Sequence, residues 1–120
     1  MKNEGKDLLL RSKTFAQRVI RLYRALPKGE VVAQVLGKQV LRSVASVGAN
    51  YREANRARSK AEFISKTGEC LKEADDTLYR LELFHDRNDV SKNRLEPLAF
   101  EAGELAAIFF TTNKRARGHE

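Results

Sequence analysis

The chain has 120 residues, which is enough for one domain with its own hydrophobic core. Two prolines, seven glycines, no tryptophan and no regularly spaced β-rich runs argue against a β-sandwich or barrel and favour an all-α protein. The single cysteine excludes an internal disulfide, and we expect a cytoplasmic protein because neither a signal peptide nor an apolar run of membrane-spanning length is visible.

The formal net charge of +7 is unevenly distributed along the sequence. Residues 1–60 contain 14 Lys or Arg against 4 Asp or Glu, whereas residues 61–120 contain 9 against 12. Such asymmetry is typical of chains that attract polyanions, and it also suits head-to-tail contact between subunits. Nucleic acid and a second copy of the chain are therefore the two partners to consider.

The chain begins with a polar segment, residues 1–7, which we expect to be flexible. From Leu8 onward apolar residues recur at helical spacing, and this predicts the first helix of a bundle that spans residues 8–114. Pro27 and Gly29 end that helix, because proline disfavours the helical conformation of the residue before it. The short turn should join the first helix to an antiparallel neighbour.

The second helix is expected from Val31 to about Ala57, and small residues crowd its middle. These small residues are Ser43, Ala45, Ser46, Gly48 and Ala49. They leave little side-chain bulk, so another backbone can approach closely. We predict that Gly48 lies at a tight helix crossing, because a glycine inside a helix costs about 1 kcal/mol relative to alanine.

Asn50 and Tyr51 follow the small residues on the same helix. Asn50 is expected to satisfy backbone groups at the crossing, with a hydrogen bond across an interface as the alternative. Tyr51 is expected in the core, with stacking on a nucleic-acid base as the alternative. Together with Ser43, Ala45 and Ala49, Tyr51 also marks a face for a neighbouring subunit.

The end of the second helix is strongly basic, with Arg52, Arg56, Arg58 and Lys60 in nine positions. Arg52, Arg56 and Lys60 recur every four residues, so one continuous helix would place them on one face. There they could contact successive phosphates without reading base sequence. We interpret these residues as the candidate nucleic-acid-binding site; the alternative is a solvated, partly salt-bridged surface.

Ser59, followed three residues later by glutamate, has the spacing of a capping box. It predicts that a third helix begins here and continues to about His85, with a bend in one longer helix as the alternative. Glu69, Glu73 and Asp76 are expected on one side of this helix. We expect them to pair with arginines of the second helix or of another subunit, since no nucleophile accompanies them for acid–base catalysis.

Two features of the third helix resemble parts of enzymes. Glu82 and His85 have the Glu-x-x-His spacing of di-iron bundles, but such a site needs a second motif, and the other histidine, His119, lies in the tail. Cys70 lies in a helical pattern away from any base, which indicates a small, half-buried side chain rather than a nucleophile. We predict no catalytic residue, no metal site and no cofactor.

Turn-forming residues 87–93 precede a fourth helix, expected from about Arg94 to about Lys114. Pro97 fits only in its first turn, where a missing backbone N–H is tolerated. Residues 115–120 form a basic tail that we expect to be flexible. Four helices joined by short loops predict a single-domain, up-down-up-down four-helix bundle.

The runs ANYREANRARS and LKEADDTLYRLEL, within residues 46–84, carry a family resemblance. They resemble four-helix bundle proteins first found as open reading frames inside intervening sequences of bacterial large-subunit ribosomal RNA. The resemblance implies a ring-like homopentamer with a basic surface and no enzymatic activity. Relatives commonly have an aromatic residue, usually tryptophan, where this chain has Arg80, which makes one spot on the third helix polar.

A related accessory protein of diversity-generating retroelements binds a reverse transcriptase and nucleic acid. We therefore expect a non-enzymatic, oligomeric interaction protein that binds RNA or DNA through its basic surface, with a role as adaptor to a nucleic-acid-processing protein. The alternative is a structural protein–protein assembly module with no nucleic-acid partner. Nothing in the sequence predicts a membrane partner.

Overall fold

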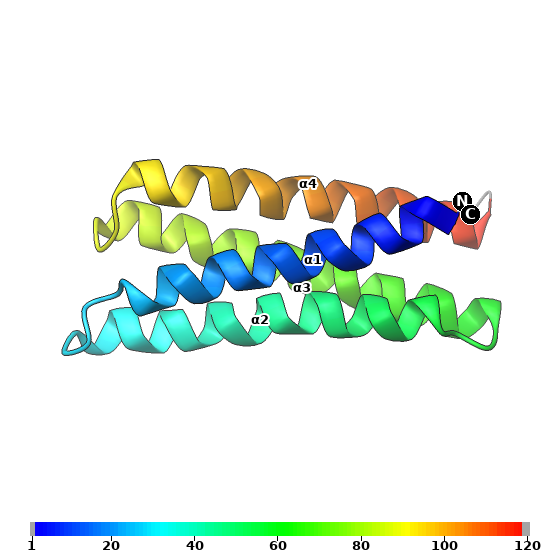
Figure 1. Cartoon of the computed structure of the whole chain (residues 1–120), viewed down its shortest axis with the longest axis horizontal. Helices are drawn as coiled ribbons and strands as arrows, with labels where there is room; N and C mark the ends of the chain where they lie inside the picture. The colour runs from blue at the N-terminus through cyan, green and yellow to red at the C-terminus, as the bar shows by residue number, and fades with distance from the viewer. Residues whose placement is uncertain (1, 119–120) are drawn as a thin grey trace.

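The computed structural model describes residues 2–118, which form four long helices packed against one another (Figure 1). They are α1 (Lys2–Arg24), α2 (Val31–Asn55), α3 (Lys60–Arg87) and α4 (Lys92–Arg117). The helices alternate in direction, so α1 begins and α4 ends at the same end of the molecule (Figure 1). The predicted all-α, up-down-up-down bundle is confirmed.

The helices extend further toward the chain termini than the sequence predicts. α1 begins at Lys2 and α4 ends at Arg117, so helix covers most of the two ends that were expected to be separate, residues 1–7 and 115–120. Gly118 follows α4 as its C-cap residue, whereas Met1, His119 and Glu120 lie outside the described part of the chain. No helix in the described part has a stretch long and apolar enough to cross a lipid bilayer.

Side-chain caps define where α2 and α3 begin. The Glu30 carboxylate accepts the backbone N–H of Ala33 at 2.8 Å, and the Ser59 hydroxyl accepts that of Glu62 at 3.0 Å. The Glu62 carboxylate in turn accepts the backbone N–H of Arg58 at 3.4 Å. These bonds satisfy donors that an uncapped helix start leaves without partners. The predicted start of the third helix is confirmed, and a single longer helix is excluded.

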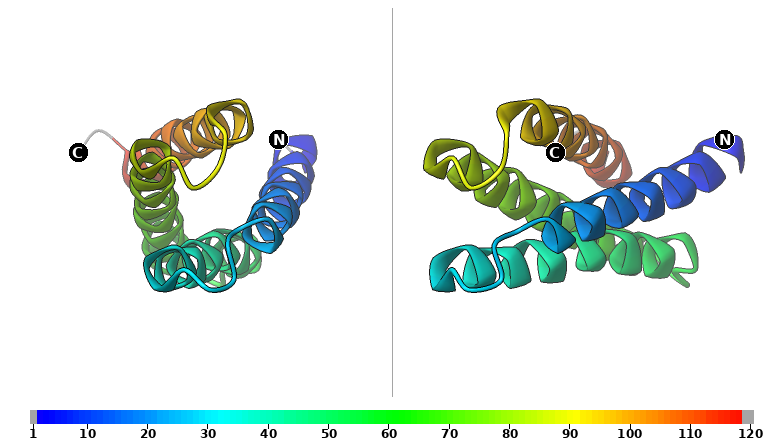
Figure 2. Two further views of the ribbon diagram at one scale, coloured as in Figure 1. Left: turned by 90° about the vertical axis from the view of Figure 1, so that its left-hand side faces the viewer. Right: turned by 60° about the vertical axis from the view of Figure 1, so that its left-hand side comes forward.

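The hydrophobic core receives side chains from all four helices. Its largest fully buried apolar members are Phe15, Val19, Val40, Val44, Val47, Leu81, Phe84, Leu95, Leu105 and Phe109. Toward the end where the chain begins, α1 diverges from α4 (Figure 2). Nε and Nη2 of Arg11 donate to the two carboxylate oxygens of Glu101 at 2.7 and 2.8 Å, and this paired contact links α1 to α4.

Among the glycines, the closest contact with a neighbouring segment is made by Gly37 of α2 rather than by Gly48. A Cβ atom on Gly37 would come within 2.7 Å of both Leu26 Cδ1 and Tyr23 Cδ1, which is too close for any real carbon. A Cβ on Gly48 would lie 3.5 Å from the Ser12 hydroxyl, an ordinary contact. Gly48 does face α1, as predicted, but the crossing there leaves room for alanine, so the predicted tightness is wrong.

We predict opposite effects for two glycine-to-alanine substitutions. Gly103→Ala adds a methyl group where a Cβ would meet nothing within 4 Å, so it should stabilise the chain by up to about 1 kcal/mol through helix propensity. The free energy of unfolding of Gly37→Ala should be about 1–3 kcal/mol lower than that of the Gly103→Ala control, because the added methyl group overpacks against α1. Urea denaturation of both variants measures the difference. Equal stabilisation by the two substitutions would contradict this packing.

Candidate nucleic-acid interface

The four predicted cations lie around the turn between α2 and α3. Arg52 belongs to the last turn of α2, Arg56 caps that helix, Arg58 lies in the turn, and Lys60 begins α3. All four side chains are exposed, and none forms an ion pair with any residue in the described part of the chain. We call these four residues the basic turn.

The arrangement differs from the predicted one, in which a four-residue spacing placed three cations on one helical face. α2 ends at Asn55, so Lys60 belongs to the next helix and cannot continue the row begun by Arg52. The cations are brought together by the reversal of the chain. Nearby, Lys66 Nζ lies 2.7 Å from Glu53 Oε1, and this hydrogen bond raises the pKa of Lys66. Lys66 is therefore already paired, in contrast to the basic turn.

A surface groove of about 810 Å³ runs between α1 and α2 beside the basic turn. We call it the basic groove. Its α2 side includes three small residues, Ala45, Gly48 and Ala49. Its charged lining consists of Lys6, Lys13, Arg52, Arg56 and a single acid, Glu53. The small-residue stretch and part of the predicted basic site therefore belong to one surface feature.

Sequence reasoning missed the contribution of α1 to this groove. Lys6 and Lys13 are exposed, lie seven residues apart, and have no ion-pair partner in the described part of the chain. Seven residues is nearly two helical turns, so the spacing itself signals a shared helix face. The sequence could not show which residues lie next to these lysines, because only the packing of α1 on α2 places them beside Arg52 and Arg56.

Two residues predicted to face a neighbouring subunit are buried inside the chain instead. Ser43 is fully buried, and its hydroxyl lies 2.8 Å from that of Thr77 on α3. Tyr51 is buried against Phe109 of α4, with ring centroids 5.7 Å apart. The predicted neighbour-facing surface of α2 is therefore wrong at these positions. Ala45 and Ala49 remain exposed.

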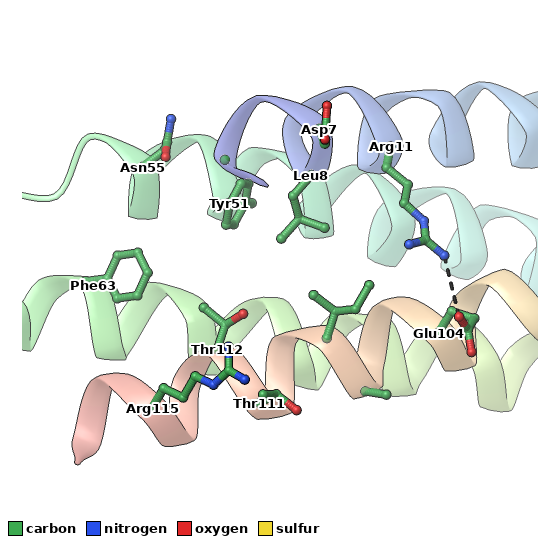
Figure 3. A pocket seen from close by; sticks show the side chains of 13 residues that line it. Asp7, Leu8, Arg11, Tyr51, Asn55, Phe63, Glu104, Thr111, Thr112 and Arg115 are labelled. Atoms are coloured by element: carbon green, nitrogen blue, oxygen red, sulfur yellow. Dashed lines mark ion pairs between the residues drawn. The ribbon is translucent and has the colours of Figure 1, made fainter. Parts of the chain in front are cut away.

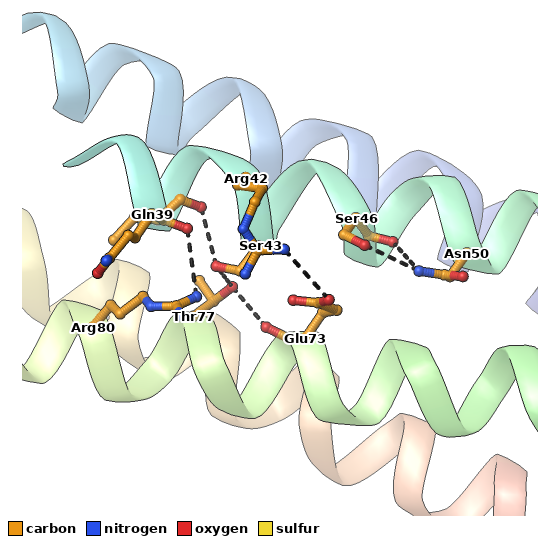
Figure 4. Close-up of polar contacts among 9 residues, drawn as sticks. Gln39, Arg42, Ser43, Ser46, Asn50, Glu73, Thr77 and Arg80 are labelled. Carbon is orange, nitrogen blue, oxygen red and sulfur yellow. Dashed lines mark hydrogen bonds and ion pairs between the residues drawn. The ribbon is translucent and has the colours of Figure 1, made fainter. Parts of the chain in front are cut away.

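Asn50 bonds to its own helix. Its Nδ2 donates to the backbone oxygen of Ser46 at 2.9 Å and lies 3.1 Å from the Ser46 hydroxyl (Figure 4). These bonds support the structural role predicted for Asn50, but they do not cross to another helix. Arg80, where the family resemblance implies an aromatic residue, reaches the backbone oxygen of Gln39 on α2 at 3.5 Å. That position is therefore a polar link between α2 and α3.

The contact between α2 and α3 also contains the carboxylate of Glu73. The sequence pattern predicted only that Glu73 lies on one side of the third helix. Glu73 is 6% exposed, and its Oε2 lies 3.8 Å from Nη1 of Arg42 (Figure 4). Its Oε1 is buried without a hydrogen-bond partner among the described residues. An acid of α3 thus pairs with an arginine of α2, as predicted, although the pair is long and Arg42 is largely exposed.

The enzyme-like features of the sequence have ordinary structural surroundings. His85 Nε2 lies 3.3 Å from Glu96 Oε2 on α4, and Glu82 is exposed. In the described part of the chain, no three His, Cys, Asp or Glu side chains lie close enough together to hold a metal ion. Cys70 is fully buried, more deeply than the half-buried position predicted, with its Sγ 3.6 Å from the Val47 carbonyl oxygen.

Comparison with known proteins agrees with the resemblance noted in the sequence. Residues 6–110 match the model of a family described as 23S rRNA-intervening sequence protein. The chain is also similar to a crystal structure from Bacteroides thetaiotaomicron, described as a protein with unknown function from the S23 ribosomal protein family. The two are 35% identical, with a TM-score of 0.83 over 92% of this chain and 97% of that one. No curated protein matches the chain.

We predict that Cys70 is unreactive in the folded protein. Burial raises the pKa of its thiol from an ordinary 9.0 to about 12, so almost no thiolate exists at pH 8. Ellman's reagent should label the urea-unfolded chain rapidly and the native chain only as fast as it unfolds. Rapid labelling of native protein would contradict the burial of this residue.

The same shift has a consequence for stability with a definite sign. Because the pKa is higher in the folded state, the thiol's contribution is fully present below about pH 9 and is lost as the pH rises toward 12. Native labelling should therefore accelerate across that interval, both because thiolate forms and because the fold weakens.

Proposed function

The chain belongs to the 23S rRNA-intervening sequence protein family, and we propose that it binds RNA or DNA through phosphate contacts, without catalysing a reaction. The observation that carries the proposal is the basic turn: four exposed cations, unpaired among the described residues, at one reversal of the chain. The basic groove beside it adds Lys6 and Lys13. Together these cations form a continuous surface for a polyanion.

The chemistry of this surface favours binding to the backbone over reading of base sequence. Lysine and arginine side chains that neutralise phosphates release condensed counterions, which lowers log K by about 0.9 per phosphate for each tenfold rise in salt. Such contacts fix the position of the nucleic acid but carry no sequence information. The small residues Ala45, Gly48 and Ala49 leave the basic groove open, so a strand can approach the α2 backbone.

The proposal includes self-assembly, for which the family resemblance gives a homopentamer. Several large apolar side chains are exposed on the outside of the bundle, and subunit contacts would cover them. Val31 is 73% exposed on α2, and Phe100 and Phe110 are 69% and 50% exposed on α4. A ring would repeat the basic turn and raise the local positive potential. An adaptor role toward a nucleic-acid-processing protein would use other parts of the same surface.

The exposed apolar residues also favour a second candidate function, a protein–protein assembly module without a nucleic-acid partner. The two functions differ in which side chains matter. Loss of basic-turn charges should abolish the first and leave the second intact. Substitution of Phe100 or Phe110 should affect assembly in both.

We expect Arg52→Gln combined with Arg56→Gln to weaken nucleic-acid binding by on the order of tenfold or more at ~50 mM salt. The salt dependence of log K should also become shallower, by about 0.9 for each lost phosphate contact. Fluorescence anisotropy of a labelled RNA strand at several salt concentrations measures both quantities. Arg21→Gln with Arg24→Gln is the matched control, because it removes the same charge from exposed sites at the other end of α1. An equal loss in that control, or no binding by the unmodified protein at low salt, contradicts the proposal.

Size-exclusion chromatography coupled to light scattering should give the mass of five chains. Phe100→Lys should shift the protein toward smaller species if α4 contributes to the subunit contacts, because a buried lysine would lack a partner. The corresponding control is Asp75→Lys on the exposed face of α3, which introduces a lysine without removing an apolar side chain. A mass near one chain at micromolar concentration rules out the assembled form.

A further inference from the structure

A second cavity, of about 690 Å³, opens between α1 and α4 at the end where the chain begins and ends (Figure 3). We call it the α1–α4 pocket. It exists because α1 diverges from α4 toward this end, while the Arg11–Glu101 contact holds the two helices together farther along. Apolar side chains from all four helices reach it: Leu8, Tyr51, Phe63 and Ile108.

Two aromatic rings line the pocket from different helices. Tyr51 of α2 is fixed from behind by Phe109, with ring centroids 5.7 Å apart and planes tilted by 49°. Phe63 of α3 is half-buried and lines the pocket on the other side (Figure 3). Tyr51 is only 6% exposed, so Phe63, which is half-buried, is the ring with more surface available for stacking.

The polar lining of the pocket contains acidic, basic and uncharged side chains. Asp7 and Glu104 are the acids of its lining, and Glu104 lies 3.9 Å from Nη2 of Arg11. Asn55 supplies an uncharged amide. Arg115 lines the pocket as well; its side chain is exposed, and no carboxylate of a described residue lies within ion-pair distance of it. The two acids are opposed by Arg11, which lines the pocket and already bonds Glu101, so the exposed Arg115 is the lining cation left to contact a phosphate.

We propose that the α1–α4 pocket holds an unpaired base of a single-stranded nucleic acid whose phosphates contact Arg115 and the basic turn. The inference rests on the proposed function and names its ligand class. The volume falls in the range of small-ligand sites, which suits a nucleobase with its sugar. Aromatic side chains accept any base by stacking, and carboxylate and amide groups can pair with the polar edge of the base.

The pocket and the basic surface are adjacent in the fold. Asn55 lines the pocket, and the next residue, Arg56, lines the basic groove on the other side of α1. A strand on the basic turn is thus within reach of the pocket. Duplex bases are stacked and paired, so they cannot enter without being extruded, and this predicts a preference for single strands.

The absence of tryptophan from the chain makes a direct optical test possible. Phe63→Trp places a unique indole in the pocket wall, and Tyr79→Trp places one on the outer face of α3, where Tyr79 is 61% exposed. Each full-length variant is titrated with oligo(dA) of about 12 nucleotides, with the same strand in a duplex, and with an abasic strand of equal length. The abasic strand keeps the phosphates but offers no base.

We expect oligo(dA) to quench the fluorescence of Phe63→Trp and to leave that of Tyr79→Trp unchanged. It should bind about tenfold or more tightly than the abasic strand, because base–aromatic stacking is lost in the latter. The duplex should bind in a salt-dependent manner without quenching. If circular dichroism shows that Phe63→Trp does not fold, Thr111→Trp is the second probe, since Thr111 is exposed and lines the same pocket.

The outcomes separate this inference from the proposed function. Equal affinity for oligo(dA) and the abasic strand, with no quenching, overturns the base pocket and leaves phosphate binding in place; the pocket would then belong to a partner of another class. Equal quenching of both tryptophan variants also overturns it, because the signal would not come from the pocket. No binding of any strand at ~50 mM salt removes both proposals.

Discussion

The buried contact between the Ser43 and Thr77 hydroxyls fixes how α2 and α3 lie against each other, and the rest of the molecule depends on that register. Both side chains are fully buried and their oxygens lie 2.8 Å apart. Each hydroxyl also bonds within its own helix, Ser43 to the Val40 carbonyl oxygen and Thr77 to the Glu73 carbonyl oxygen. A shift of one helical turn would therefore break the hydroxyl–hydroxyl bond between the helices, worth about 0.5–1.5 kcal/mol, and leave each hydroxyl its bond within the helix. The register in turn places Cys70 beside Val47 and brings the chain reversal to the Ser59 cap, where the basic turn projects.

Local signals in the sequence were sufficient for the fold and for part of the site. Apolar spacing predicted four helices, and Ser59 marked the start of α3 because its cap is formed by residues close in sequence. The exposure of the basic turn also followed from composition. Gly37 was overlooked in favour of Gly48 because its close neighbours come from outside its own helix, Tyr23 from α1 and Leu26 from the turn that follows α1. A glycine's importance depends on what faces it, and no local pattern contains that information.

The burial of Glu73 and Thr77 was missed for a different reason. Both are polar, so a search for apolar periodicity passes over them, although they lie on the buried side of α3 with Cys70 and Ala74. The burial of Ser43 on α2 was missed for the same reason. Polar residues that satisfy one another across a helix contact can be recognised only when both helices are considered together, because each looks like a surface residue on its own helix.

In the proposed complex, the separation of the cationic surface from the aromatic surface would make the chain selective for single strands. Phosphate contacts alone would hold duplexes and single strands alike. In this proposal the α1–α4 pocket adds a site for an unpaired base, while the phosphates contact the cations outside it. This division requires that α1 stay apart from α4 near its start while remaining attached. The Arg11–Glu101 contact meets both requirements. Its two parallel hydrogen bonds join α1 to α4 at one point, and the helix ends that diverge beyond this point frame the pocket.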